Sequence, residues 1–400
     1  MKRIVIGQAG GPTAVINTSL VGFVENAKKN NLLYGVLNGY EGLVKDNLIE
    51  IKDETLNLVR KHKYVPGACL GSGRYRLTDD KIEIAVNNLK KHNINALVFI
   101  GGNGTMAALQ KIKDSSNKMG YELQVIGIPK TVDNDLGITD HAPGFASAAK
   151  FVAFSARDIS RDLDAMRNFE QVRIIETMGR NAGWLAAASG LLKQVAEEGP
   201  HIIYLPERKF HIGGFLTDVK DLVKEYGTAT IVVSEGISLD DDNKVQKAVV
   251  DGRVVLGGVS QRLEEIVKEN LGLSSRGENL GMNQRSSSLA TSSQDRIEAY
   301  EVGKKAAELI DKEETNVMVT IQNNNIKEYN YYLGSCLLEL VASAGEKALP
   351  DEFIESPERY YEWLRPLIGG DISSYPSQLL GRKISCNDYD RTKIYSTYGN

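Results

Sequence analysis

Residues 123–135 read Leu-Gln-Val-Ile-Gly-Ile-Pro-Lys-Thr-Val-Asp-Asn-Asp, an apolar run that ends in a cation, a hydroxyl group and two carboxylates. The apolar part predicts a buried strand of a parallel sheet, because such strands are covered on both faces and lack polar alternation. Lys130 can hold a phosphate group, and Asp133 or Asp135 can remove a proton or help to hold a metal ion. This combination suits phosphoryl transfer to an alcohol, although a polar turn after a strand explains the heptapeptide alone equally well.

Short β-branched runs alternate with amphipathic stretches along the chain. We expect strands at Ile4–Gly7, Ala96–Ile100, Val125–Ile128, Val172–Glu176, Ile202–Leu205, Thr230–Ser234 and Val317–Ile321. Helical periodicity predicts helices at Thr18–Lys29, Lys81–Lys91, Met106–Lys113, Ala146–Asp164 and Phe215–Tyr226. Apolar strands separated by helices indicate parallel sheets with helices on both faces. The predicted fold class is therefore α/β, with two doubly wound, mainly parallel-sheet domains and the active site in the cleft between them.

Size and composition exclude several functional classes. The 400 residues suffice for two domains, and 42% hydrophobic with 25% charged residues is ordinary for a globular protein. A net charge of −4 argues against nucleic-acid binding. The three scattered cysteines indicate neither disulfides nor a zinc site, and no apolar run approaches the ~20 residues of a membrane span. We expect a cytoplasmic protein that binds neither membrane nor nucleic acid.

Unusual residues gather where the predicted strands end, which is where doubly wound sheets bind their ligands. Gly10-Gly11-Pro12 follows the first strand, and Gly101-Gly102-Asn103-Gly104-Thr105 follows the strand at Ala96–Ile100. Such small residues allow backbone N–H groups to approach an anion at a helix N-terminus. Gly71-Ser72-Gly73-Arg74 adds a guanidinium group that can grip phosphate oxygens. Each turn alone is explained as well by structural glycines, but together with Lys130 they favour a phosphate site.

Further candidates follow later strands. Met178-Gly179-Arg180 resembles a second anion or sugar-phosphate contact, and Glu235 can hold sugar hydroxyl groups, although a polar residue at a strand end is an equally good interpretation. The GxGxxG, GxxxxGK[ST] and GxSxG motifs are absent. The five histidines, among them His141, lack metal-binding spacing and are interpreted as surface or core residues.

In chain order, seven motifs resemble those of the phosphofructokinase family, over the stretch from Ile4 to about Ala307. They are Gly10–Thr13, Gly71–Arg74, Gly101–Thr105, Pro129–Asp135, Met178–Arg180, Ser234–Gly236, and Arg276 with Gln284-Arg285. The resemblance implies a 6-phosphofructokinase that phosphorylates the 1-hydroxyl of fructose 6-phosphate in glycolysis, with Mg²⁺ and either ATP or pyrophosphate. It also implies a homodimer or a homotetramer.

The resemblance implies a role for each matching residue. The catalytic residues would be Asp133 as general base, Lys130 and Thr131. The phosphoryl donor would be bound by Gly10, Gly11, Arg74, Gly102, Gly104 and Thr105, and the metal by Asn103 and Asp135. The sugar phosphate would be bound by Thr131, Asp133, Met178, Gly179, Arg180, Glu235, Arg276 and Arg285. The donor domain would comprise residues 1–138 and about 253–303, and the sugar-phosphate domain, with a C-terminal extension, residues 139–252 and about 304–400.

Departures from the family pattern bear on the metal and the donor. Asn103 stands where the family usually has Asp, so it offers a metal an oxygen without charge. Met282 replaces a His of the short ATP enzymes and points to the longer branch of the family. Gly104 opens a space that an Asp fills in pyrophosphate-using relatives, where its carboxylate excludes the α-phosphate of ATP, whereas Lys130 is typical of those relatives. We favour ATP as the phosphoryl donor, and therefore an ATP-dependent 6-phosphofructokinase. The alternatives are a reversible pyrophosphate--fructose 6-phosphate 1-phosphotransferase and a catalytically degenerate regulatory subunit.

Overall fold

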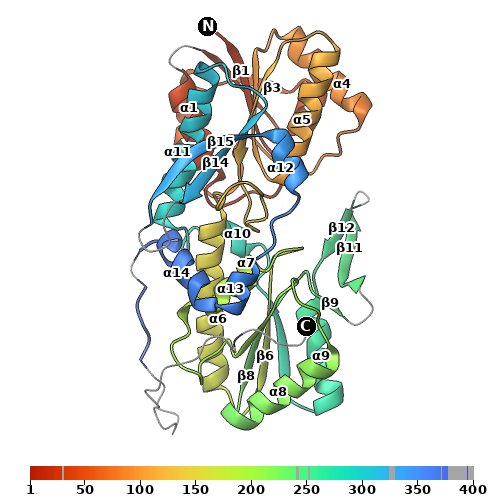
Figure 1. Ribbon diagram of the computed structural model, residues 1–400, viewed down its shortest axis with the longest axis vertical. Coiled ribbons are helices and arrows are strands. Elements are labelled where there is room, and N and C mark those ends of the chain that lie inside the picture. Colours follow the sequence, from red (N-terminus) through yellow and green to blue (C-terminus); the bar gives the residue numbers. More distant parts are fainter. Residues whose placement is uncertain are drawn as a thin grey trace. The chain divides into compact units, whose positions relative to one another are not determined.

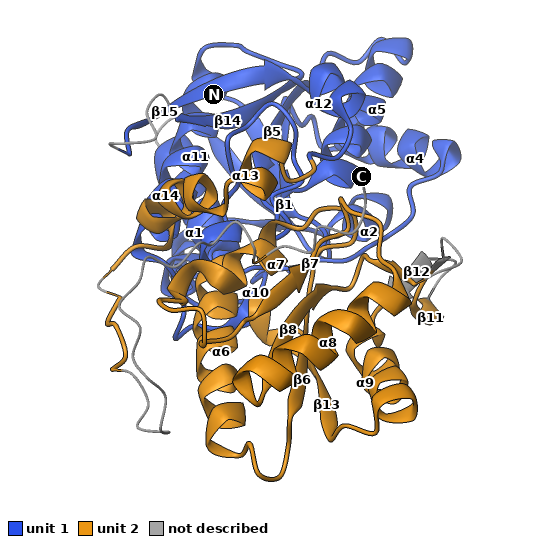
Figure 2. Ribbon diagram, turned by 60° about the horizontal axis from the view of Figure 1, so that its bottom comes forward, with its two compact units in different colours: residues 1–148, 285–347 blue, residues 149–284, 348–400 orange. Residues whose placement is uncertain are grey.

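The computed structural model describes residues 1–28, 31–239, 243–250, 253–323, 329–370, 372–376 and 394, and Figure 1 labels its helices and strands. The chain forms two compact units, which Figure 2 colours separately. Unit 1 comprises Met1–Ala148 and Arg285–Lys347, and unit 2 comprises Ala149–Gln284 and Ala348–Asn400. None of the helices in the described ranges has the length and apolar character of a membrane span.

Unit 1 is built on a seven-stranded sheet in the order β15-β14-β5-β4-β1-β2-β3. The strands are β1 (Arg3–Gln8), β2 (Leu32–Val36), β3 (Leu48–Glu50), β4 (Ala96–Gly101), β5 (Gln124–Pro129), β14 (Val317–Asn323) and β15 (Tyr331–Leu337). The five inner strands, β14, β5, β4, β1 and β2, pair in parallel with one another. The edge strands β15 and β3 pair antiparallel with β14 and β2. The helices are α1 (Ile16–Ala27), α2 (Tyr40–Val44), α3 (Asp53–Lys61), α4 (Asp79–Lys91), α5 (Asn103–Lys118), α11 (Ser293–Asp311) and α12 (Leu338–Ala344).

Helices cover both faces of this sheet. Successive residues of a strand point to opposite faces, and those of β1 accordingly join two apolar clusters. Ile4 and Ile6 pack with residues of α1 and α11, and Val5 packs with residues of α4 and α5. All three side chains are fully buried. The predicted α/β class and the doubly wound arrangement are therefore confirmed for unit 1.

Unit 2 is built on a four-stranded parallel sheet in the order β13-β6-β8-β7. The strands of this sheet are β6 (Val172–Thr177), β7 (Ile202–Tyr204), β8 (Ala229–Ser234) and β13 (Ser275–Asn279). Two small antiparallel pairs are separate from it: β9 (Ser238–Leu239) pairs with β10 (Asn243–Lys244), and β11 (Gln246–Val250) pairs with β12 (Arg253–Leu256). Its helices are α7 (Trp184–Ala188), η2 (Ser189–Leu192), α8 (Ile212–Tyr226), α9 (Val259–Leu271), α13 (Asp351–Glu355) and α14 (Pro357–Ile368). Helices α6 (Phe145–Ala165) and α10 (Asn283–Ser286) contain two of the three boundaries between the units, and the third follows Lys347. Ile174 and Ile231 pack with α8 and α9 on one face of the sheet.

The units differ from the expected domains in three segments. Residues 139–148 belong to unit 1, although they were expected in the sugar-phosphate domain. Strand β13 belongs to unit 2, because it pairs with β6 in parallel register, although its residues were expected in the donor domain. Strand β14 belongs to unit 1, because it pairs with β5 and β15, although its residues were expected in the sugar-phosphate domain. The expected C-terminal extension can be compared with the structure only in part, because residues 377–393 and 395–400 lie outside the described residues.

Candidate active site

Three of the predicted motifs meet at one edge of the unit 1 sheet. Strands β1, β4 and β5 are parallel neighbours, so the segments that follow them emerge at the same edge. The Lys130 N–H donates to the Gly101 carbonyl at 3.0 Å. A Cβ built on Gly10 would lie 3.2 Å from Lys130 Nζ. The glycine turns after β1 and β4 and the polar segment after β5 are therefore direct neighbours.

The turn after β1 needs glycine and holds a fourth motif. Gly10 has a φ of 78°, in the left-handed region that side chains disfavour. Its N–H donates to the Gly73 carbonyl at 3.1 Å, and Ser72 Oγ donates to the Gly10 carbonyl at 2.5 Å. These bonds place the loop that carries Arg74 beside the turn.

The turn after β4 opens a long helix. Gly102 is the N-cap of α5, and Asn103, Gly104 and Thr105 form its first turn. No side chain of the described residues caps this helix end. Backbone N–H groups and the positive end of the helix dipole make such a terminus favourable for an anion. The placement fits the predicted donor-phosphate contact.

Cationic and anionic side chains near Lys130 change its pKa in opposite directions. Lys130 is only 4% exposed. Burial lowers its pKa to about 8; Asp135 and Asp133 oppose that shift, and Arg285 and Arg74 add to it. Burial followed by Arg74 lowers the pKa of Arg285, whereas Asp133 raises it. A Cβ on Gly11 would overlap the Arg285 guanidinium, so this arginine, predicted as a sugar-phosphate ligand, lies among the donor candidates.

The segment after Lys130 forms a closed loop, residues 131–144. The Thr131 N–H donates to the Pro143 carbonyl at 3.3 Å, and Thr131 bridges to Gly144. Thr131 Oγ1 donates to Asp135 Oδ1 at 2.8 Å and accepts the Asp133 N–H at 3.1 Å. One hydroxyl group at the base of the loop therefore sets the positions of both aspartates.

The predicted metal ligands are also neighbours. Asn103 Nδ2 donates to the Asp135 main-chain carbonyl at 3.0 Å. Mg²⁺ in phosphoryl-transfer sites is typically held by one or two carboxylates together with substrate phosphates. The carboxylates of Asp133 and Asp135, together with the Asn103 amide, offer oxygen ligands of the kind that this ion prefers.

The unit 2 candidates form a second group. Met178–Arg180 and Glu235 follow β6 and β8, which are parallel neighbours. The Glu235 N–H donates to the Thr177 carbonyl at 2.9 Å. Ser234 Oγ donates to the Gly179 carbonyl at 2.5 Å. An exposed arginine and a carboxylate therefore stand together at the carboxyl edge of this sheet.

Arg276 lies away from that group. It pairs in register with Arg173, near the amino end of β6, whereas Met178 lies beyond the carboxyl end. At ~3.3 Å per residue, ~16 Å of strand separates the two positions. The Arg276 guanidinium lies 3.6 Å from the Glu170 carboxylate. Within unit 2, Arg276 and Met178 therefore lie near opposite ends of the same strand pair.

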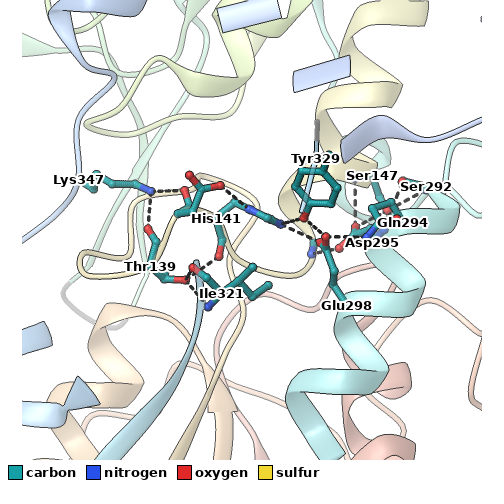
Figure 3. A network of polar contacts seen from close by, with 12 residues as sticks. Thr139, His141, Ser147, Ser292, Gln294, Asp295, Glu298, Ile321, Tyr329 and Lys347 are labelled. Atoms are coloured by element: carbon teal, nitrogen blue, oxygen red, sulfur yellow. Dashed lines mark hydrogen bonds and ion pairs between the residues drawn. The ribbon is translucent and has the colours of Figure 1, made fainter. Parts of the chain in front are cut away.

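A buried polar network in unit 1 was not foreseen from the sequence (Figure 3). His141 is 1% exposed, with Nδ1 2.8 Å from Asp140 Oδ2 and Nε2 2.7 Å from Glu298 Oε2. Burial lowers the pKa of His141, but Glu298 and Asp140 outweigh burial and raise it to about 10. The Tyr329 hydroxyl also donates to Glu298. His141 is a core residue, one of the two kinds expected for the histidines, and two of its partners, Glu298 and Tyr329, come from distant parts of the chain.

The family and the relatives of this chain show that it is a phosphotransferase that acts on an alcohol group, and the cation and carboxylates at its strand ends fit that chemistry. The chain belongs to the phosphofructokinase family, whose sequence model matches residues 3–310. The predicted resemblance is confirmed.

Individual relatives extend over nearly the whole chain. It is 48% identical to a sulfofructose kinase of Alkalicoccus urumqiensis, over 92% of this chain and 95% of that protein. It is 36% identical to a pyrophosphate--fructose 6-phosphate 1-phosphotransferase of Rhodospirillum rubrum, over 92% of this chain and 94% of that protein. The crystal structure of a pyrophosphate-dependent phosphofructokinase from Nitrosospira multiformis matches with a TM-score of 0.84 at 34% identity, covering 95% of both chains.

Proposed function

We propose that this chain transfers the terminal phosphoryl group of ATP to the 1-hydroxyl group of a fructose that carries an anion at carbon 6. Fructose 6-phosphate is the first candidate acceptor, with fructose 1,6-bisphosphate as the product. The main support is the group of Lys130, Asp133 and Asp135 beside two glycine turns at one sheet edge. A cation for the phosphates and a carboxylate for the proton are what phosphoryl transfer to an alcohol requires.

Each residue has a role in this proposal. Asp133 removes the proton of the sugar hydroxyl, a contribution of ~10²–10⁴-fold in rate. Lys130 and Arg74 neutralise the charge of the donor phosphates, and Gly10 and Gly104 let the backbone approach them. In unit 2 the acceptor's carbon-6 anion binds beside Met178, Gly179 and Arg180, and its hydroxyl groups bind to Glu235. Asp135 and Asn103 would hold Mg²⁺, which neutralises phosphate charge when bound.

The choice of ATP depends on Gly104. It is exposed in the first turn of α5, and a Cβ built there would meet no atom within 4 Å. An aspartate would fit this position, so glycine leaves room for an α-phosphate. The pyrophosphate alternative is supported by Lys130 and by the relative from Rhodospirillum rubrum.

A second candidate acceptor is sulfofructose, here a fructose with a sulfonate at carbon 6. The 48% identity to a sulfofructose kinase favours it. A sulfonate carries one negative charge, whereas a phosphate monoester carries ~1.5–2 at neutral pH. Met282 adds no charge where the short ATP enzymes have His, and Arg276 lies at the other end of its strand pair. A site with fewer cations suits the singly charged acceptor.

A matrix of two donors and two acceptors tests the proposal. Purified protein with Mg²⁺ is assayed with ATP or pyrophosphate against fructose 6-phosphate or sulfofructose, and kcat/KM is compared over the four pairs. The expected result is the highest value with ATP. Turnover with pyrophosphate alone would overturn the donor assignment. If acceptors bind but no pair turns over, the chain is the degenerate regulatory subunit instead.

A further inference from the structure

Lys347, in the C-terminal part of the chain, binds the active-site loop at three points. Its N–H donates to the Asp135 carbonyl at 2.8 Å. Its Nζ donates to the Thr139 carbonyl at 2.9 Å and to the Asp140 carbonyl at 2.7 Å. Figure 3 shows this ammonium group over the chain around Thr139. The preceding residue, Glu346, also bridges to Leu136.

The two limbs of the loop 131–144 have different anchors. On the returning limb, Thr139 Oγ1 accepts the Ile321 N–H from β14 at 3.0 Å, and Asp295 of α11 accepts the Gly144 N–H at 2.9 Å. The outgoing limb carries the aspartates, and there Asp135 is bound by Asn103 and by the Lys347 main chain. Lys347 therefore bonds to both limbs.

We propose that Lys347 is a positioning residue for phosphoryl transfer, which fixes Asp133 and Asp135 by tying the outgoing limb of their loop to the returning limb. This inference rests on the proposed function. Thr131 Oγ1 accepts the Asp133 N–H and donates to the Asp135 carboxylate, so both aspartates are bound to the first residue of the loop. If the Lys347 ammonium group is lost, two main-chain carbonyls lose a donor and the limbs can separate. Displacement of a catalytic group by 1 Å can cost ~10²-fold in rate.

Lys347→Met is the test, because methionine keeps an unbranched stem and removes the ammonium group. Lys2→Met is the matched control: Lys2 Nζ donates to Gln124 Oε1 at 2.9 Å and to the Ile310 carbonyl at 3.1 Å in the same unit, at the amino end of β1.

We expect Lys347→Met to lower kcat ~10²-fold with an unchanged KM for the acceptor, because the acceptor anion binds in unit 2. Lys2→Met should lower the Tm but not kcat, and Lys347→Arg, which keeps donors and charge, should recover part of kcat. A kcat for Lys347→Met equal to that of wild type, or the same loss in Lys2→Met, overturns the inference.

Hydrogen exchange measured by mass spectrometry separates this inference from the proposed function. In Lys347→Met the amides of residues 131–141 should exchange faster, while those of 96–101 in β4 stay unchanged. In Lys2→Met the loop amides should keep their wild-type rates. If the wild-type protein turned over none of the donor and acceptor pairs, the proposed function would fail, and exchange alone would decide whether Lys347 holds the loop. Unchanged exchange in Lys347→Met refutes the inference in either case.

Discussion

Replacement of Gly104 by aspartate tests the choice of donor without disturbing the fold. The residue lies in the first turn of α5, its backbone is outside the left-handed region, and a Cβ there meets no atom within 4 Å. An aspartate in the first turn of a helix is itself favourable by ~0.3–1 kcal/mol, because its negative charge is attracted to the positive end of the helix dipole. The Tm of Gly104→Asp should therefore equal or exceed that of wild type.

The effect on ATP follows from Coulomb's law. A carboxylate and one α-phosphate charge ~5 Å apart repel each other by ~3 kcal/mol at an effective dielectric constant of ~20. At ~1.4 kcal/mol per tenfold, this corresponds to a loss of ~10²-fold in kcat/KM for ATP. Pyrophosphate has no α-phosphate at that place, so its kcat/KM should change far less.

The assay compares both donors at a fixed acceptor concentration in wild type, Gly104→Asp and Gly104→Asn. Asparagine has the size of aspartate without its charge, so it separates repulsion from steric exclusion. The expected order of kcat/KM with ATP is wild type, then Gly104→Asn, then Gly104→Asp. Equal losses with ATP and pyrophosphate in Gly104→Asp would refute the reasoning, since no donor-specific contact would then exist at this position.

Three further predictions concern single charged groups. Asp133→Ala should remove nearly all turnover, ~10²–10⁴-fold, while acceptor binding stays measurable by calorimetry; turnover near the wild-type level contradicts its role as base. Because the pKa of Lys130 is about 8, its charge is present below that pH and lost above it. The kcat/KM for the donor should therefore fall above pH 8, and an alkaline limb that persists in Lys130→Met contradicts the assignment. The pKa of His141 is raised from 6.5 to about 10, so the stability it contributes is full below pH 6.5 and lost as pH rises through 10. The Tm difference between wild type and His141→Gln should be larger at pH 6 than at pH 10, and equal differences would refute this ion pair.

The seven strands expected from apolar runs all exist, as β1, β4, β5, β6, β7, β8 and β14. Each is largely buried and pairs in parallel with at least one neighbour, which is why a continuous apolar run identified it. Strand β13 was missed because its residues, Ser275–Asn279, are polar and partly exposed at the edge of the unit 2 sheet. Strand β15 was missed for a similar reason, since three of the seven residues of this edge strand are exposed and none is fully buried. Apolar patterning reports burial, so the buried edge strand β7 was predicted, whereas the exposed edge strands β13 and β15 were not.

The same limit explains which site residues could be predicted. Gly10, Gly104 and Lys130 lie within three residues of the ends of buried parallel strands, so their positions in the sequence fix the sheet edge at which they lie. Arg276 lies inside a strand, and its place depends on the register of β13 against β6, which the sequence does not display.

The Lys347 contacts lie beyond this kind of prediction for a different reason. Its partners, Asp135, Thr139 and Asp140, offer main-chain carbonyls, which every residue possesses, so no side-chain motif marks the interaction. Lys347 itself supplies its donors to a loop that lies more than 200 residues earlier in the chain. A glycine turn can bind phosphate through local geometry, whereas an aspartate that must meet a sugar hydroxyl within a fraction of an ångström needs support from outside its own loop. Residues of β14, α11 and the segment after α12 bind the returning limb of the loop that carries Asp133, and these contacts become visible only when the chain is folded.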